Sequence, residues 1–316
     1  HWLLFANGLV FLYATVPWLS PIAYATGHPL LGWLLFVIYR PFCHQIPERS
    51  FFLLGYQVAY CHREVAMYTA LALGGLGGWL FVQARLPLPW MLGSMVLCTA
   101  AALIRLPVAA PPVIRPPMTA VIGVMLGASF KPEVIAQLPN WLPTLGGLVL
   151  FMVACGLCCV GYFRRVAGFD PVTAFFSGMP GGLIEMVTVG EEKGGDARII
   201  ALIHSARILL VVMTLPFLVQ WIGGVSLGGG RVAGPSLAQT PFGSELWLIG
   251  CGILGVIAGH WLRLPAKYLL GPMLVSAIVH VTGLSAAVPP AEIVNAAQLV
   301  LGVAIGCRFV GTPPRI

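Results

Sequence analysis

Charged residues are scarce in this chain, since Asp, Glu, Lys and Arg together make up 9% of its 316 residues. An average globular domain carries about 25% charged residues. So few charges cannot cover the surface of a water-soluble protein of this size, because polar side chains are needed to face the solvent. The shortage excludes a cytosolic enzyme. It indicates an integral membrane protein, in which apolar side chains face lipid and helices satisfy the backbone.

Other hallmarks of soluble or secreted proteins are missing as well. The eight cysteines lie mostly inside apolar stretches and form no pattern typical of a disulfide framework. The net charge of +7 comes from dispersed Lys and Arg, without the basic stripe that follows nucleic-acid phosphates. No HExxH, Walker A or GxSxG pattern occurs in a suitable strand–helix context. We therefore expect a protein that is not an enzyme, needs no cofactor and binds no nucleic acid.

Apolar runs are abundant, because 59% of the residues are hydrophobic. A helix needs about 20 apolar residues to cross the hydrocarbon core of a bilayer. The sequence predicts an all-α, polytopic membrane protein with about ten spans, separated by Pro- and Gly-rich turns. We expect these spans near residues 2–21, 29–42, 65–84, 89–105, 116–130, 141–163, 199–222, 244–262, 267–283 and 294–310.

The second half of the chain repeats part of the first. Residues recur 178 positions later in the pairs Gly77 and Gly255, Pro87 and Pro265, and Gly93 and Gly271. After one residue of slippage, Gly127 aligns with Gly306. A shared apolar bias would not keep Gly and Pro in register, so duplication is the better explanation. We assign helix-packing roles to Gly77, Pro87, Gly93, Gly127, Pro265 and Gly271.

Internal repeats in a membrane protein are typical of secondary transporters. If the segment near 171–193 dips into the membrane and returns, most loop Lys and Arg fall on one face, as the positive-inside rule favours. A full crossing divides them evenly. We therefore expect inverted repeats and a broken or re-entrant helix there. The chain divides into an N-terminal membrane hairpin (1–69), a first repeat (70–225) and an incomplete second repeat (244–316).

Pro180, Gly181 and Gly182 interrupt an apolar region. Pro removes a backbone donor and the two Gly free the chain, so unpaired backbone groups become available. At membrane depth, irregular backbone is tolerated only where it is buried in protein or lines a wet cavity. A helix that restarts after Gly182 would point free N–H groups at an anion in that cavity. The alternative is a purely structural kink.

Several ionisable residues follow this break. An ionisable side chain within a membrane is by default a functional-site hypothesis, which applies to Glu185 and Arg207. His204 lies one helical turn before Arg207, so the two share a face and could both turn toward Glu185. Alternatively, Glu185 lies near the interface and Arg207 snorkels. Asp196 begins the same run, and we expect it to cap a helix.

Two Cys-His pairs mark the N-terminal part, Cys43 with His44 and Cys61 with His62. Four such side chains are enough for a zinc ion, but adjacent ligands differ from the spaced pairs of structural zinc sites. We expect no metal here and favour a tightly turned loop with partly buried cysteines. These four residues are only weak metal-ligand candidates.

Specific motifs lie between about 70 and 316: Leu86-Pro87-Leu88-Pro89-Trp90, Gly123-Val124-Met125-Leu126-Gly127, Pro180-Gly181-Gly182-Leu183-Ile184-Glu185 and His204-Ser205-Ala206-Arg207. They resemble the AbrB duplication family of bacterial inner-membrane proteins, which implies that location. Residues 1–70 resemble a separate family of small membrane proteins, through Cys43-His44-Gln45, Pro47-Glu48-Arg49-Ser50 and Gly55-Tyr56-Gln57. The first family is labelled both a regulator of gene expression and an ammonia monooxygenase, and neither label follows from these residues.

The favoured hypothesis is a secondary transporter or exporter of a small anionic or zwitterionic solute. The expected partners are the lipid bilayer, the solute and a coupling proton or sodium ion, and a homo-oligomer stays open. The expected substrate- and ion-binding residues are Pro180, Gly181, Gly182, Glu185, His204 and Arg207. The alternative is a membrane-bound regulator of gene expression that acts through a partner. A membrane monooxygenase comes third, because seven dispersed His offer no copper or iron site.

Overall fold

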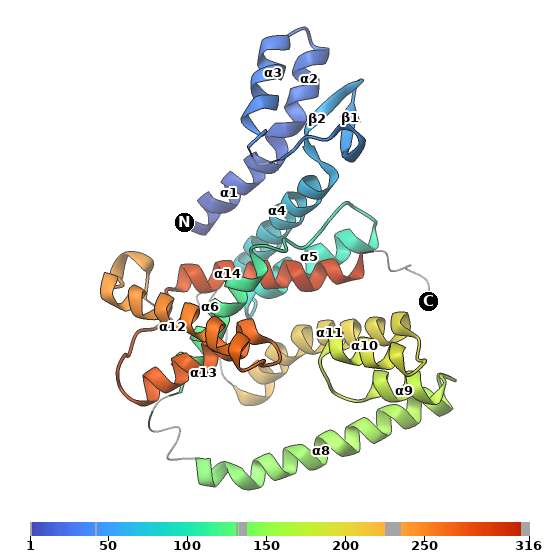
Figure 1. The fold of residues 1–316 in the computed structure, drawn as a ribbon, viewed down its shortest axis with the longest axis vertical. Coiled ribbons are helices and arrows are strands. Elements are labelled where there is room, and N and C mark those ends of the chain that lie inside the picture. The colour runs from blue at the N-terminus through green and yellow to red at the C-terminus, as the bar shows by residue number, and fades with distance from the viewer. Residues whose placement is uncertain (1, 42, 131, 133–137, 225–234, 311–316) are drawn as a thin grey trace. The chain divides into compact units, whose positions relative to one another are not determined.

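A computed structural model describes residues 2–41, 43–130, 132, 138–224 and 235–310 (Figure 1). The described chain is mostly α-helical, with one two-stranded sheet. It forms two compact units, the first made of His1–Phe130 with Val219–Ile316 and the second of Lys131–Leu218. The all-α fold expected for a membrane protein is therefore confirmed. The compact units, however, do not coincide with the two sequence repeats.

The N-terminal part of the first unit ends in a β-hairpin that the sequence analysis did not anticipate. Its elements are α1 (Trp2–Thr15), α2 (Leu19–Ala25), α3 (Pro29–Ile38), β1 (Ser50–Leu53) and β2 (Tyr56–Cys61). The two strands pair antiparallel around Leu54 and Gly55, whose φ angles are +53° and +83°. A two-residue hairpin turn often needs positive φ at both central residues, and Leu is an unusual residue for such a turn.

The two repeats supply the main helical core of the first unit. The first contributes α4 (His62–Gln83), α5 (Pro89–Leu103) and α6 (Arg115–Ala128), and the second contributes α12 (Phe242–Trp261), α13 (Lys267–Val281) and α14 (Ala291–Gly306). In each repeat the first helix packs on the second. The third helices are exchanged, because α14 packs along α5 and α6 packs along α13. This reciprocal exchange is what a pseudo-two-fold relation between duplicated halves produces.

Repeat-related glycines make equivalent contacts in both halves. A Cβ atom on Gly77 would collide with the backbone of Gly93, and one on Gly255 would collide with the backbone of Gly271. Helices α4 and α5 therefore approach so closely that a side chain cannot fit between them, and the same holds for α12 and α13. Gly127 lies equally close to the backbone of α13. Equivalent contacts at equivalent positions support the duplication.

The turns inside the two repeats share an unusual backbone. Arg85 and Leu88 have φ angles of +53° and +43°, and their counterparts Arg263 and Ala266 have +51° and +48°. Residues other than Gly rarely adopt such angles. Each turn contains one of the expected packing prolines, Pro87 or Pro265.

The second unit contains the expected helix break. Its helices are α8 (Leu138–Arg165), α9 (Pro171–Gly178), α10 (Leu183–Glu192) and most of α11 (Ala197–Gly223). Between α9 and α10, residues 179–182 are not helical. The predicted interruption near 171–193 is thus confirmed as a break between two short helices.

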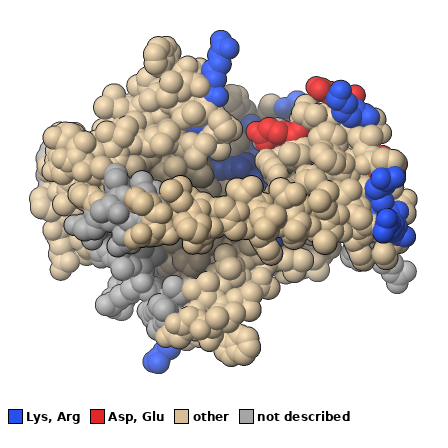
Figure 2. Space-filling model, turned by 90° about the horizontal axis from the view of Figure 1, so that it is seen from below, with Lys and Arg blue, Asp and Glu red and all other residues tan. Residues whose placement is uncertain are grey.

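The number of membrane spans was predicted too high. Each of the ten expected runs contains a helix, but five described helices are long and apolar enough to cross a membrane. These are His62–Gln83, Pro139–Arg165, Ala197–Gly223, Gly243–Trp261 and Ala291–Phe309. The longest helix in each of the other five runs has only 10 to 15 residues, in α1, α3, α5, α6 and α13. On the face drawn in Figure 2, charged side chains are few and most of the surface is uncharged, as lipid contact requires.

Candidate functional site

Pro180 leaves one carbonyl group of α9 without its helical partner. In an α-helix the N–H of each residue donates to the carbonyl four positions earlier. The carbonyl of Phe176 would therefore pair with residue 180, which has no N–H because it is proline. Met179 still donates to the carbonyl of Phe175, at 3.0 Å, and the helix ends there. The break thus leaves the Phe176 carbonyl without a donor from its own helix.

His204 of α11 supplies the missing donor. Its Nε2 lies 2.8 Å from the carbonyl oxygen of Phe176, and the His204 side chain is 1% exposed. A carbonyl can only accept, so Nε2 carries the proton. Arg207 Nη2 lies 2.6 Å from His204 Nδ1, and a guanidinium can only donate. The two partners together select the neutral imidazole with its proton on Nε2.

Arg207 also reaches the break itself. Its Nη1 donates to the carbonyl oxygen of Met179 at 3.5 Å, directly before Pro180. The side chain is half-buried, and its position beside the carbonyl end of α9 suits a positive charge. A guanidinium has five N–H donors, so donors remain for a further acceptor.

Helix α10 begins at Leu183 with Gly182 as its N-cap, which has no side chain to cap the helix. Its first internal backbone bond runs from Met186 N to Gly182 O, at 2.9 Å. The N–H groups before Met186 have no partner within the helix. Glu185 is exposed, and a Cβ atom on Gly182 would collide with its carboxylate. The Glu185 carboxylate thus lies against the positive end of its own helix.

The structure brings together only part of the expected set. Among the described residues, Glu185 forms no ion pair with Arg207. Pro180, Gly181 and Gly182 are exposed, so the break is open on one side and lined by His204 and Arg207 on the other.

Two aspartates cap the N-termini of α9 and α11, the helices on either side of the break and of α10. Asp196 accepts from the N–H groups of Arg198 and Ile199 at 2.8 and 3.1 Å, which confirms the expected N-cap of α11. Asp170 caps α9 in the same way, and the sequence analysis missed it. Asp followed by Pro171 is a recognisable helix start, so the signal was present. Thr173 joins the two caps, because its Oγ1 accepts from the N–H of Asp196 at 2.8 Å.

The N-terminal motif residues are linked by hydrogen bonds that hold the loop. Gln45 Nε2 donates to the carbonyls of Phe36 and Ala59 at 2.6 and 3.0 Å. Gln57 Nε2 donates to the carbonyl of Gln45 at 2.7 Å and to Ser50 Oγ at 3.0 Å. Glutamines and a serine from separate parts of the motif therefore join in one network that shapes the loop and hairpin.

The weak metal-ligand candidates line one pocket of about 480 Å³. They are Cys43, His44, Cys61 and His62. Cys43 Sγ accepts from the N–H of Cys61 at 3.3 Å, and burial raises the pKa of the Cys43 thiol. Within the described part of the chain, no three His, Cys, Asp or Glu side chains form a group suited to a metal ion.

Comparisons with known proteins place the chain among membrane proteins. Residues 90–315 match the family described as "Transition state regulatory protein AbrB", and residues 43–110 match one described as "Predicted membrane protein (DUF2085)". No solved structure matches the chain.

Among individual relatives, the chain is similar to "Uncharacterized protein YhjN" of Bacillus subtilis (strain 168). The two are 27% identical over 265 residues, covering 76% of this chain and 68% of YhjN. It is also similar to "Putative regulator AbrB" of Escherichia coli (strain K12), with 24% identity over 234 residues, 72% of this chain and 66% of that protein. The chain thus spans about two thirds of the length of these relatives.

Proposed function

The chain belongs to the AbrB family of membrane proteins, and from its helix break we propose that it is a secondary transporter of a small anionic or zwitterionic solute. We further propose that it is a multi-pass protein of the bacterial inner membrane and that it catalyses no chemical reaction. Arg207 at the break between α9 and α10 carries the proposal. A break of this kind recurs at the substrate sites of secondary transporters, where half-helix N-termini face anionic groups.

Two sources of positive potential support an anionic guest. The Arg207 guanidinium donates to the carbonyl of Met179, the residue that follows α9, and the uncapped first turn of α10 starts four residues later. Unpaired N–H groups and the helix dipole favour negative charge at that end. Hydrogen bonds to a charged group contribute about 1.5–3 kcal/mol each, so a carboxylate that reaches both features would be held selectively.

His204 is proposed as a positioning residue. Its Nδ1 accepts from Arg207 while its Nε2–H is held by Phe176, so the imidazole cannot rotate without losing a bond. The guanidinium is thereby oriented with its remaining donors free. Replacing His204 should weaken solute binding through Arg207, without any contact between His204 and the solute.

Glu185 is proposed as the site of the coupling proton. When ionised, its carboxylate lies against Gly182 and occupies the positive end of α10. Protonation removes that attraction and frees the helix end for the solute anion. Proton and anion would then bind together, which couples their movement in one direction. Sodium coupling is the alternative, in which the ion binds the ionised carboxylate.

Flux measurements on proteoliposomes test the proposal. Uptake of radiolabelled acetate, lactate, succinate, glutamate and alanine would be recorded with and without a proton gradient, because a monoanion that moves with one proton carries no net current. We expect Arg207→Ala to lower the flux of the active solute at least about tenfold, the effect of losing one charge-assisted bond. The Glu185→Gln variant should bind the solute with an affinity that does not change with pH. Its solute flux should no longer respond to the proton gradient.

Matched controls lie on the same two helices. Arg198 on α11 and Glu191 on α10 are exposed and lie away from the break, so Arg198→Ala and Glu191→Gln should leave flux unchanged. Each variant must keep the melting temperature of the wild type. If flux survives both Arg207→Ala and Glu185→Gln, the residue assignment is wrong.

A regulatory role is the second candidate, favoured by the name of the Escherichia coli relative, "Putative regulator AbrB". In that case the protein would act on gene expression through a partner. It would then carry no solute in the flux assay and would co-purify with a soluble regulator.

A further inference from the structure

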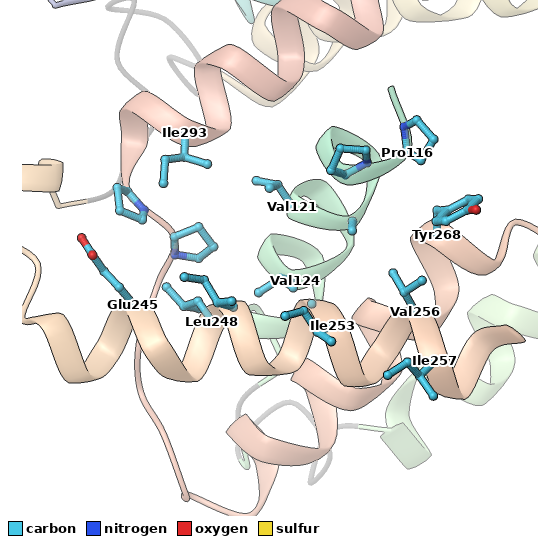
Figure 3. A pocket seen from close by; sticks show the side chains of 16 residues that line it. Pro116, Val121, Val124, Glu245, Leu248, Ile253, Val256, Ile257, Tyr268 and Ile293 are labelled. Carbon is cyan, nitrogen blue, oxygen red and sulfur yellow. The ribbon is translucent and has the colours of Figure 1, made fainter. Parts of the chain in front are cut away.

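A pocket of about 530 Å³ lies in the first unit, between α6, α12, α13 and the start of α14 (Figure 3). Its lining is almost entirely aliphatic, with Glu245 at one end and Tyr268 at the other. Ligand sites are commonly of this size and combine an apolar lining with a few polar groups. All the residues that line the pocket belong to the first unit and the helix break belongs to the second, and the inference does not depend on the proposed transport.

In the first repeat, the groove that corresponds to this pocket is filled by side chains. At the equivalent place in the first repeat, a Cβ atom on Gly78 would collide with the ring of Trp90, and one on Gly74 would collide with Val303. Both glycines are buried. The groove between α4, α5 and α14 is therefore closed by side chains that lie directly on glycines.

The second repeat has exchanged the residues that close the groove. Val256 stands where Gly78 does, and Tyr268 stands where Trp90 does. A valine side chain keeps the aromatic ring away from the α12 backbone, so the ring cannot fill the space. A Cβ atom on Gly252, the counterpart of Gly74, would meet only Val124, at 3.9 Å. The pocket is thus the opened counterpart of a closed groove.

The open side of the pocket lies along a membrane-spanning helix. Ile249, Ile253 and Ile257 of α12 line it and are still 57%, 58% and 59% exposed. Because α12 is one of the five helices able to cross a membrane, its exposed apolar face is suited to hydrocarbon. A ligand would enter from the bilayer, and it must itself be largely apolar.

The two ends of the pocket differ in charge. Glu245 carries a carboxylate that forms no ion pair with any described residue. At the other end, the Lys267 ammonium lies 5.4 Å from the centre of the Tyr268 ring and 3.1 Å from His260 Nδ1. From Glu245 to Ile257 the helix rises about 18 Å. The unpaired Glu245 carboxylate attracts a cation to its end of the apolar pocket. The Lys267 ammonium, beside Tyr268 at the other end, repels a cation.

We propose that this pocket binds an amphiphile with a hydrocarbon chain and an ammonium headgroup. The ammonium pairs with Glu245, and the chain lies along α12 toward Tyr268. The length of the pocket and its opposite charges fix this orientation. A neutral lipid chain or a second copy of the protein would use the apolar surface alone and would gain nothing from Glu245.

Photolabelling in phosphatidylcholine nanodiscs tests the proposal. The probes are a dodecylamine and a dodecanol that carry the same chain diazirine, and labelled residues are mapped by mass spectrometry. We expect the amine to label the pocket faces of α6 and α12, in preference to the alcohol by at least about fivefold. Glu245→Gln should abolish that preference, while Glu292→Gln, whose carboxylate already accepts from Ser236 and Leu237, should keep it.

Filling the pocket separates a bound ligand from ordinary lipid contact. Val256→Trp places an indole ring in the pocket and should reduce the labelling of the pocket by both probes. Leu254→Trp is its control, because Leu254 lies on the same helix, is 60% exposed and does not line the pocket. Equal labelling of the exposed face and the pocket, or labelling unchanged by Val256→Trp, would show bulk lipid only and overturn the proposal. Protection that appears only in an oligomer would assign the surface to a second copy and overturn it as well.

Discussion

The imidazole of His204 donates from Nε2 to the carbonyl oxygen of Phe176 at 2.8 Å, and Phe176 lacks a helical donor because residue 180 is proline. A helix break that leaves a buried carbonyl unpaired is unfavourable. A side chain from a helix 28 positions away removes that penalty. The same imidazole then orients Arg207. Pro180 therefore creates the acceptor that fixes the positions of His204 and Arg207 on α11.

The first prediction concerns this compensation. His204→Ala should lower the free energy of unfolding by about 1–3 kcal/mol, because it leaves the half-buried Phe176 carbonyl without a donor. Pro180→Ala restores a backbone N–H that can donate to the same carbonyl. In the Pro180→Ala background, His204→Ala should therefore cost about 0.5–1.5 kcal/mol less. A double-mutant cycle of unfolding in detergent micelles measures this coupling.

The exposed His28 provides the control for that cycle. His28→Ala should change stability little and should show no coupling to Pro180→Ala. Strict additivity of Pro180→Ala and His204→Ala would mean that the two residues do not share the Phe176 carbonyl.

The second prediction concerns the close helix contact in the second repeat. Gly255→Ala puts a methyl group into the backbone of α13 and should lower stability by about 1–3 kcal/mol. Gly250→Ala on the same helix has no heavy atom within 4 Å of the added Cβ, and should raise stability by up to about 1 kcal/mol through helix propensity. Melting temperatures of the two variants decide the matter. If both change alike, the packing at Gly255 is not as close as described.

Asp170 allows a prediction about pH. A side-chain hydrogen bond from Thr173, and then backbone N–H donors of Thr173 and Val172, hold the pKa of Asp170 below its usual value. A carboxyl with a lower pKa in the folded state adds stability above its unfolded pKa, about 3.9, and loses it as the pH falls through the folded value. The stability difference between wild type and Asp170→Asn should therefore shrink below about pH 4. Melting curves from pH 7 to pH 3 would show it, and a constant difference would contradict the role of the charge.

The sequence predicted those features that depend only on neighbouring residues, namely the helix break and the helix start. Pro180 and Gly182 mark the break because proline lacks a donor, and Asp196 marks a helix start because its side chain reaches the next N–H groups. The repeat was visible because Gly and Pro serve contacts that other residues cannot make. The bond between His204 and Phe176 was not predictable, since it depends on how α11 packs against α9.

Two other features depended on tertiary structure. The hairpin turn holds Leu54 at a positive φ, which strand pairing imposes against the preference of leucine. The apolar pocket arises because Val256 replaces a glycine of the first repeat, and its effect appears only once α12 and α13 are packed together. The span count was too high because hydropathy alone does not show where a turn shortens a helix.

The last prediction concerns Gln45, whose position in the N-terminal motif now has a structural reason. Its side-chain amide donates to two carbonyls, Phe36 and Ala59, and it is 7% exposed with a φ of +51°. Gln45→Leu removes both donors and should cost about 1–3 kcal/mol, whereas His44→Leu at the exposed neighbour should cost little.

Gln45→Glu tests the two hydrogen bonds more directly, because it keeps the shape of the side chain. It replaces the donating amide with carboxylate oxygens, which can only accept, beside the same two carbonyl oxygens. Burial and these oxygens should raise the pKa of the new carboxyl in the folded protein above its unfolded value. The folded state then binds the proton more tightly, so the variant should be least stable at neutral pH and should recover part of its stability as the pH falls toward 5. Thermal unfolding at pH 5 and pH 7, beside the wild type, measures the effect. Equal losses at both values would mean that residue 45 does not face the two carbonyls.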